Sequence, residues 1–127
     1  MSLISVLLVA IGGAIGSVCR YLVGIGAGRL LGPDFPYGTM TVNVVGSFVM
    51  GLFIELLALK FDGSEPLRLF VAVGILGGFT TLSSFSLDTI VLFERGAVAT
   101  AAVYVGGSII LSLAALVAGL HLVRAFA

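Results

Sequence analysis

Charged residues are scarce in this chain: they make up only 9% of 127 residues, and the six basic and six acidic side chains cancel to a net charge of zero. Soluble globular domains carry about 25% charged residues, so an ordinary soluble domain is excluded. No basic cluster is present, which leaves nucleic-acid binding without an electrostatic basis. Hydrophobic residues make up 60% of the sequence, and the mean hydropathy is +1.29. The composition indicates a single-domain integral membrane protein.

The groups that enzymes and proton-coupled pumps use are also missing. Cys19 is the only cysteine and cannot pair within the chain, and His121 is the only histidine. No metal-ligand cluster, nucleophile–base set or phosphate loop is visible, so we predict that the protein is not an enzyme. The carboxylates of Glu55 and Glu94 lie near expected helix ends and that of Asp88 lies off centre. A proton-coupled exporter of cations would need an acid inside the membrane, so that class is disfavoured.

Four apolar runs long enough to cross a bilayer are separated by turn-forming residues. They predict transmembrane helices at about residues 3–28, 38–59, 67–93 and 97–123. Both termini then lie on one side of the membrane. The basic residues are divided almost equally between the two sides, so the positive-inside rule gives almost no orientation. Because four short helices also enclose too little space for a pore, we expect the chain to pair with its inverted copy.

The middle of the third run is unsuited to a plain transmembrane helix. Two adjacent glycines and four hydroxyl residues gather there: Gly77, Gly78, Thr80, Thr81, Ser83 and Ser84. Irregular backbone at mid-membrane is tolerated only inside protein or beside a water-filled cavity. Transporters use such broken helices to direct free carbonyls, amides and helix ends at ions. We therefore predict a helix break near residues 75–81 and place the functional centre there.

The second and fourth helices each carry polar residues at four-residue spacing, which places them on one face of each helix. They are Thr39, Asn43 and Ser47, and Thr100, Tyr104, Ser108 and Ser112. Hydroxyls in membrane helices often bond back to their own i−4 carbonyls, and Asn43 can serve as a contact between helices. Two matched stripes of neutral donors favour a polar conduit suited to a small anion. Aromatic ring edges are partly positive, so Phe85 is either an anion-facing ring or a packing residue.

Three charged residues in or near the helices have open roles at this stage. Arg20 lies deep in the first helix and is expected to face protein or an aqueous vestibule, either as a structural arginine or as an attractor of anions. Glu55 is expected to meet lipid headgroups or Lys60. Asp88 is either exposed in a vestibule or paired with a basic side chain. The residues alone therefore predict a midplane pathway for ions or polar solutes, without fixing its selectivity.

Three segments resemble the bacterial Fluc/CrcB fluoride channels, namely residues 13–21 (GAIGSVCRY), 38–48 (GTMTVNVVGSF) and 77–86 (GGFTTLSSFS). The likeness extends over the whole chain, and the third segment is its specific part. It implies a dual-topology antiparallel homodimer in the bacterial inner membrane that exports fluoride passively through two antiparallel pores and relieves fluoride toxicity. It also implies a structural Na⁺, not transported, at the dimer centre and held by the backbone carbonyls of Gly77 and Thr80.

Carried over residue by residue, the resemblance places Arg20 in a vestibule and implies a set of pore residues drawn from three helices. The set is Asn43, Thr81, Leu82, Ser83, Ser84, Phe85, Tyr104, Ser108 and Ser112. Leu82 departs from the family, which usually has phenylalanine there, so one of two pore rings is missing and reduced fluoride throughput is expected.

Two other functions were weighed against the fluoride channel. A small dual-topology multidrug exporter would need a membrane-embedded glutamate in the first helix, and the first helix here has no acid. A non-transporting protein that packs through its glycines would leave the break in the third helix unexplained, because a packing helix needs no unwinding at mid-membrane.

Overall fold

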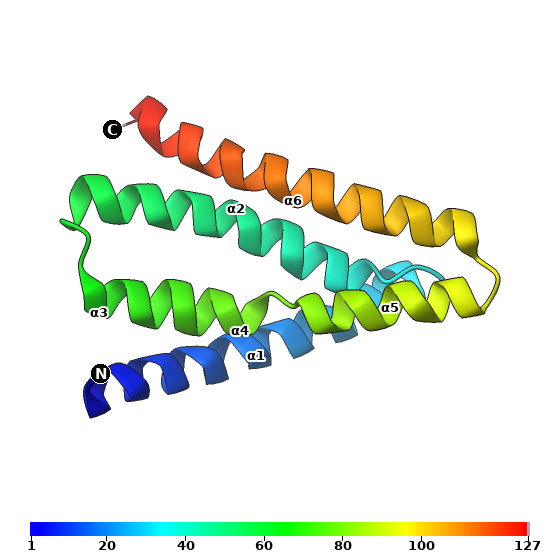
Figure 1. Ribbon diagram of the computed structural model, residues 1–127, viewed down its shortest axis with the longest axis horizontal. Helices are drawn as coiled ribbons and strands as arrows, with labels where there is room; N and C mark the ends of the chain where they lie inside the picture. Colours follow the sequence, from blue (N-terminus) through cyan, green and yellow to red (C-terminus); the bar gives the residue numbers. More distant parts are fainter. Residues whose placement is uncertain (127) are drawn as a thin grey trace.

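The computed structural model describes residues 1–126, and within them the chain is all-helical. Four helical segments are long and apolar enough to cross a membrane, which confirms the predicted four-helix fold with an interrupted third helix. The third segment consists of four consecutive elements, and Figure 1 shows it as one long rod with a single non-helical interruption. The elements in order are α1 (Leu3–Leu31), α2 (Tyr37–Lys60), α3 (Glu65–Leu67), the π-helix η1 (Arg68–Leu76), α4 (Gly77–Phe79), α5 (Leu82–Glu94) and α6 (Val98–Phe126).

The N-terminus and the last turn of α6 lie at the same end of the bundle, together with the connection from α2 to α3 (Figure 1). The connections from α1 to α2 and from α5 to α6 lie at the opposite end. Each of the three connections contains a glycine with positive φ: Gly32 at 86°, Gly63 at 67° and Gly96 at 82°. L side chains rarely adopt this region, so glycine allows these sharp reversals.

The helices pack in two closely apposed pairs, α2 along α6 and α1 along η1 and α4. Glycines make both approaches possible because a side chain would collide with the neighbouring backbone. A Cβ at Gly16 would meet the Ile75 carbonyl oxygen, and a Cβ at Gly51 would meet the carbonyl oxygen of Leu116. Such small residues let membrane helices approach backbone to backbone. The glycine-rich appearance of the sequence therefore reflects helix contact as much as any break.

The interruption of the third span is shorter than the predicted 75–81 and falls at Thr80 and Thr81 alone. Thr80 has φ −87° and ψ 158°, and Thr81 has φ −154° and ψ 126°. The glycines that were expected to weaken the helix are helical, and a Cβ on Gly78 would lie 2.6 Å from the carbonyl oxygen of Gly13. Thr81 begins α5 as its N-cap, accepting a 3.1 Å hydrogen bond from the Ser84 N–H at Oγ1. Threonine is a favoured N-cap, so the hydroxyl residues determine where the helix restarts.

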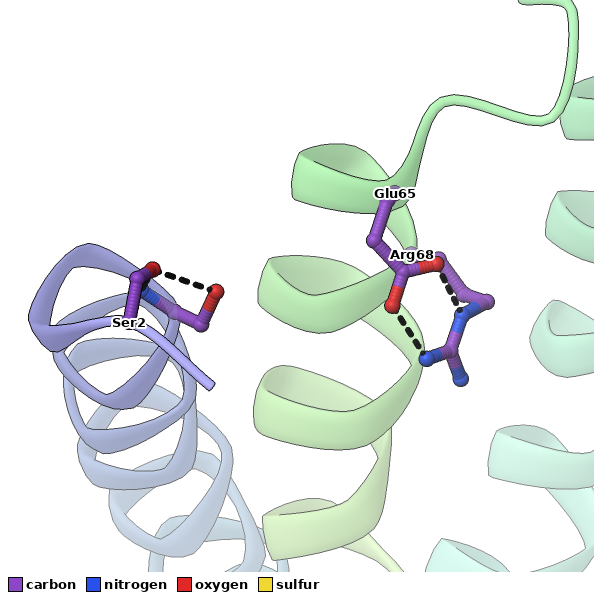
Figure 2. A network of polar contacts seen from close by, with 4 residues as sticks. Ser2, Glu65 and Arg68 are labelled. Carbon is purple, nitrogen blue, oxygen red and sulfur yellow. Dashed lines mark hydrogen bonds and ion pairs between the residues drawn. The ribbon is translucent and has the colours of Figure 1, made fainter.

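Ion pairs lie at the end of the bundle that holds the N-terminus. Figure 2 shows the Arg68 guanidinium facing the carboxylate of Glu65, with an N–O distance of 2.7 Å. Arg124 near the end of α6 forms a 3.1 Å ion pair with Glu55, whose side chain is only 15% exposed. The prediction that Glu55 meets headgroups or Lys60 is therefore wrong. It failed because α2 and α6 lie side by side, so a residue far along the chain is nearer in space.

Candidate ion pathway

The helix break is braced by Asn43 of α2. The Asn43 Nδ2 donates to the Thr81 carbonyl at 2.9 Å, and its Oδ1 accepts from the Thr81 N–H at 2.7 Å. One side chain thus satisfies both backbone groups of the extended residue, which would otherwise remain unpaired in an apolar environment. The Nδ2 group carries a second hydrogen that this pairing does not use. Asn43 therefore contacts the predicted functional centre directly and retains donor capacity there.

The same bonding leaves two backbone carbonyls without their regular helical donors. In an α-helix the carbonyl of residue i accepts from the N–H of residue i+4. The Thr81 N–H is directed to Asn43 instead of Gly77, and the Ser84 N–H is directed to Thr81 Oγ1 instead of the Thr80 carbonyl. The carbonyls of Gly77 and Thr80 are the two that the family resemblance assigns to Na⁺. Among residues 1–126 there is no group of three or more histidine, cysteine or acidic side chains that could hold a metal, so a cation here would rely on backbone oxygens.

A groove of about 440 Å³ lies between α2, the helix break and α6, and is open along one side. Its lining combines apolar side chains with neutral donors from all three segments. It gathers six of the nine predicted pore residues, namely Asn43, Thr81, Leu82, Phe85, Ser108 and Ser112. Leu82 is 75% exposed at the start of α5. A groove open on its side does not enclose a pore, so this chain alone supplies only part of a wall.

Ser108 carries the buried side-chain polar group of this groove that lacks a protein partner. Its side chain is 4% exposed, and within the described residues its Oγ has no hydrogen-bond partner. Thr80, Ser86 and Thr89 show the ordinary behaviour of hydroxyls in membrane helices, because each donates to the carbonyl four residues earlier. A buried hydroxyl without a partner is costly. Its position indicates a group that a ligand or water would satisfy.

Three predicted pore residues lie outside this groove. Ser83 is exposed, with its Oγ 3.2 Å from Thr81 Oγ1. Ser84 lines a second cavity on the other side of the break. Tyr104 has no exposed surface and donates its hydroxyl to Asp88 Oδ2 at 3.0 Å.

The contacts of Tyr104 also place two residues that the sequence left open. Asp88 accepts the tyrosine hydroxyl and also lines an open cavity of about 320 Å³ beside the α1–α2 connection. Within the described residues it forms no ion pair, so the second of its two expected roles is not seen. Phe85 packs against the Tyr104 ring, with centroids 5.2 Å apart, and still lines the groove. Phe35, from the α1–α2 connection, meets the same ring edge-on at 5.5 Å. Nothing in the sequence pointed to Phe35, because an aromatic residue in a short connection carries no periodic signal.

Arg20 makes a structural contact and also lines a cavity, while its expected attraction of anions stays a prediction. Its Nε donates to the Gly78 carbonyl at 3.0 Å, and the side chain is partly buried. It also lines the second cavity, of about 330 Å³, together with Thr39, Thr81 and Ser84. The helix break thus borders two spaces, a cavity that the charged Arg20 side chain lines and the groove that contains Ser108.

The comparisons with known proteins agree over nearly the whole chain. Residues 7–120 match the family described as CrcB-like protein, Camphor Resistance (CrcB). A protein of Agrobacterium fabrum named fluoride-specific ion channel FluC is 57% identical over 122 residues, covering 96% of this chain and 98% of the relative. The protein of the same name from Rhizobium johnstonii is 58% identical over 125 residues, covering 98% of this chain and 100% of the relative. That of Nitrobacter winogradskyi is 55% identical over 119 residues, covering 94% of both chains.

Proposed function

The chain belongs to the CrcB-like protein family, and on that premise we propose that it is a multi-pass membrane channel that conducts fluoride passively and relieves fluoride toxicity. It is not an enzyme, because the relatives are named ion channels and the described residues offer hydrogen-bond donors for an ion. The donors along the pathway are neutral, and α1 (Leu3–Leu31) contains no acidic residue that could carry protons through the membrane. Both features fit passive conduction. The absence of an acid in α1 also argues against the multidrug exporter.

The observation that carries this proposal is the unpartnered hydroxyl of Ser108 in the groove. A dehydrated fluoride ion needs several hydrogen-bond donors at close range, since it gives up its hydration shell to enter a narrow site. Ser108 and Ser112 from α6, with the free Nδ2 hydrogen of Asn43 from α2, offer such donors along one wall. The partly positive ring edge of Phe85 adds to them.

The groove gains a closed wall in an antiparallel homodimer, which is the assembly we propose. Three facts support it: the groove is open on its side, Leu82 beside it is 75% exposed, and Gly77 is exposed although its carbonyl lacks a helical donor. An unpaired carbonyl facing lipid costs several kcal/mol, on the order of a lost hydrogen bond in hydrocarbon. A second copy related by a two-fold axis in the membrane plane would cover these groups and form two antiparallel pores.

We further propose that the carbonyls of Gly77 and Thr80 hold a structural sodium ion together with the same carbonyls of the second copy. Hard cations such as Na⁺ take oxygen ligands, and carbonyls freed at a helix break are a known source of them in membrane proteins. The donor set fits because both carbonyls have lost their i+4 amide. The ion would join the two copies through their breaks; it would not itself cross the membrane.

The test of the function is efflux from liposomes that contain the purified protein, with a potassium gradient and valinomycin to carry the counter-charge. We expect fluoride release without chloride release from the wild-type protein, and slower fluoride release from Ser108→Ala. Ile110→Ala, on the same helix but outside the groove lining and 67% exposed, is the matched control and should release fluoride at the wild-type rate. Release of neither ion from a folded dimer, or equal release of both, would refute the proposal.

A further inference from the structure

Arg20 is a charged residue in the middle of α1, and one hydrogen bond offsets the cost of placing a charge there. A charge in the interior of a membrane is expensive unless it faces protein or water. Its Nε donates to the backbone carbonyl of Gly78 at 3.0 Å. That carbonyl belongs to α4 (Gly77–Phe79), the last turn before the break. The arginine therefore bonds the short helix that contains Gly77, one of the two residues whose carbonyls are proposed to hold the cation.

We propose that Arg20 is a positioning residue: its Nε–H fixes the last helical turn before the break, and this bond, more than attraction of anions, is its contribution to the channel. The inference rests on the proposed fluoride pathway and adds a residue that sets its geometry.

The contacts around Gly78 support this assignment. A Cβ on Gly78 would lie 2.6 Å from the Gly13 carbonyl oxygen and 3.2 Å from the Ser17 nitrogen. The α4 backbone is therefore pressed directly on α1, and Arg20 lies one further turn along the same helix. α4 continues directly from η1, and the Thr80 N–H bonds the Leu76 carbonyl, so the start of this turn is already fixed. The Arg20 hydrogen bond adds a directed contact at the Gly78 carbonyl, nearer the break, and restrains the direction of the neighbouring Gly77 carbonyl.

The break is then held from two sides by side chains that act on consecutive parts of the backbone. Arg20 bonds Gly78, two residues before the extended segment, and Asn43 pairs with both backbone groups of Thr81 within it. Neither side chain replaces the other, because they come from different helices and bond different residues. Losing the arginine bond should leave the Asn43 pairing intact while loosening α4.

Three substitutions separate the hydrogen bond from the charge. In Arg20→Gln the amide Nε2 stands at the same number of bonds from the backbone as the arginine Nε, so the donor stays and the charge is lost. In Arg20→Lys the charge stays, but a methylene replaces the donor at that position. Arg20→Met removes both. If Arg20 acts as a positioning residue, the order at the break and the fluoride efflux are highest in the wild type, lower in Arg20→Gln, and lowest in Arg20→Lys and Arg20→Met. If Arg20 acts by attracting anions, Arg20→Lys behaves like the wild type.

The first measurement is hydrogen–deuterium exchange of the amides in residues 77–84 in the reconstituted protein. We expect exchange in Arg20→Lys and Arg20→Met to be roughly ten- to a hundredfold faster than in the wild type, since a charge-assisted hydrogen bond is lost. Arg20→Gln should exchange more slowly than either. Fluoride efflux should follow the same order. Equal exchange in all four proteins, or an efflux rate in Arg20→Lys above that in Arg20→Gln, would overturn the proposal.

A measurement on the wild-type protein covers the case in which the variants do not fold. The Arg20 Nε–H proton, observed by NMR in detergent or nanodiscs, should exchange slowly with water because it is held in a bond to a buried carbonyl. Rapid exchange of that proton would overturn the assignment. Both exchange measurements are independent of conduction. A wild-type protein that passes no fluoride would therefore refute the proposed function while leaving the role of Arg20 to be decided by exchange.

Discussion

The pairing of Asn43 with Thr81 offers the sharpest test of how the helix break is held. Asn43→Leu keeps a side chain of similar size and removes both hydrogen bonds, of 2.9 Å and 2.7 Å. Hydrogen bonds between membrane helices contribute about 0.6 kcal/mol on average and up to about 1.7. Two such bonds to one residue give roughly 1–3 kcal/mol for local opening at the break. Since 1.4 kcal/mol is a factor of ten, opening should become about five- to 150-fold more frequent.

The assay is hydrogen–deuterium exchange at residues 80–84, combined with fluoride efflux from the same liposomes. We expect faster exchange confined to the break, lower efflux, and an unchanged dimer, because both bonds lie within one chain. Val45→Leu, on the same helix and 46% exposed, is the control and should alter neither. Lower efflux with unchanged exchange would mean that Asn43 acts on the ion alone. No change in either would refute the reasoning, since Asn43 would then be only a contact between helices.

Three further predictions concern the groove, the break and the orientation of the chain. Leu82→Phe supplies a ring edge beside the groove and should raise fluoride efflux with fold and dimer kept; equal efflux from both proteins in liposomes would count against a role for this position. Gly46→Ala places a methyl group too close to the Cγ2 atom of Thr80, so it should displace the break. The free energy of unfolding, measured by unfolding in denaturing detergent, should fall by roughly 1–3 kcal/mol. Gly106→Ala, which has open space around it, is the control. Reporter fusions at the C-terminus should reveal both orientations in one membrane, and a single orientation would remove the antiparallel dimer.

Much of the fold follows from patterns that act within one helix. The apolar runs alone predict four spans, and the cluster of hydroxyl residues at Thr80, Thr81, Ser83 and Ser84 predicts that the third is interrupted. The four-residue spacing of Ser108 and Ser112 places them on one face, and the structure brings both to the groove beside Asn43. These features are local because helix periodicity and capping depend on residues a few positions apart.

The sequence could not show which groups meet across the bundle. Gly78 looks like a helix breaker in sequence, yet it is helical and serves contact with α1. The bond from Arg20 to Gly78 joins residues 58 positions apart, and that from Tyr104 to Asp88 joins residues on different helices. Such partners depend on how α1 and η1, or α5 and α6, are set against each other. The one local signal that was overlooked is Thr81, whose place just before a helix is typical of an N-cap.

Passive conduction selective for fluoride is the property on which all the other predictions depend. The most direct measurement is the reversal potential of currents across a planar bilayer containing the purified protein, with separate fluoride and chloride gradients. For a tenfold fluoride gradient we expect a reversal potential close to the fluoride equilibrium value of about 59 mV, unchanged when chloride is varied. A reversal potential that follows chloride, or the absence of any current from a folded dimer, would contradict it.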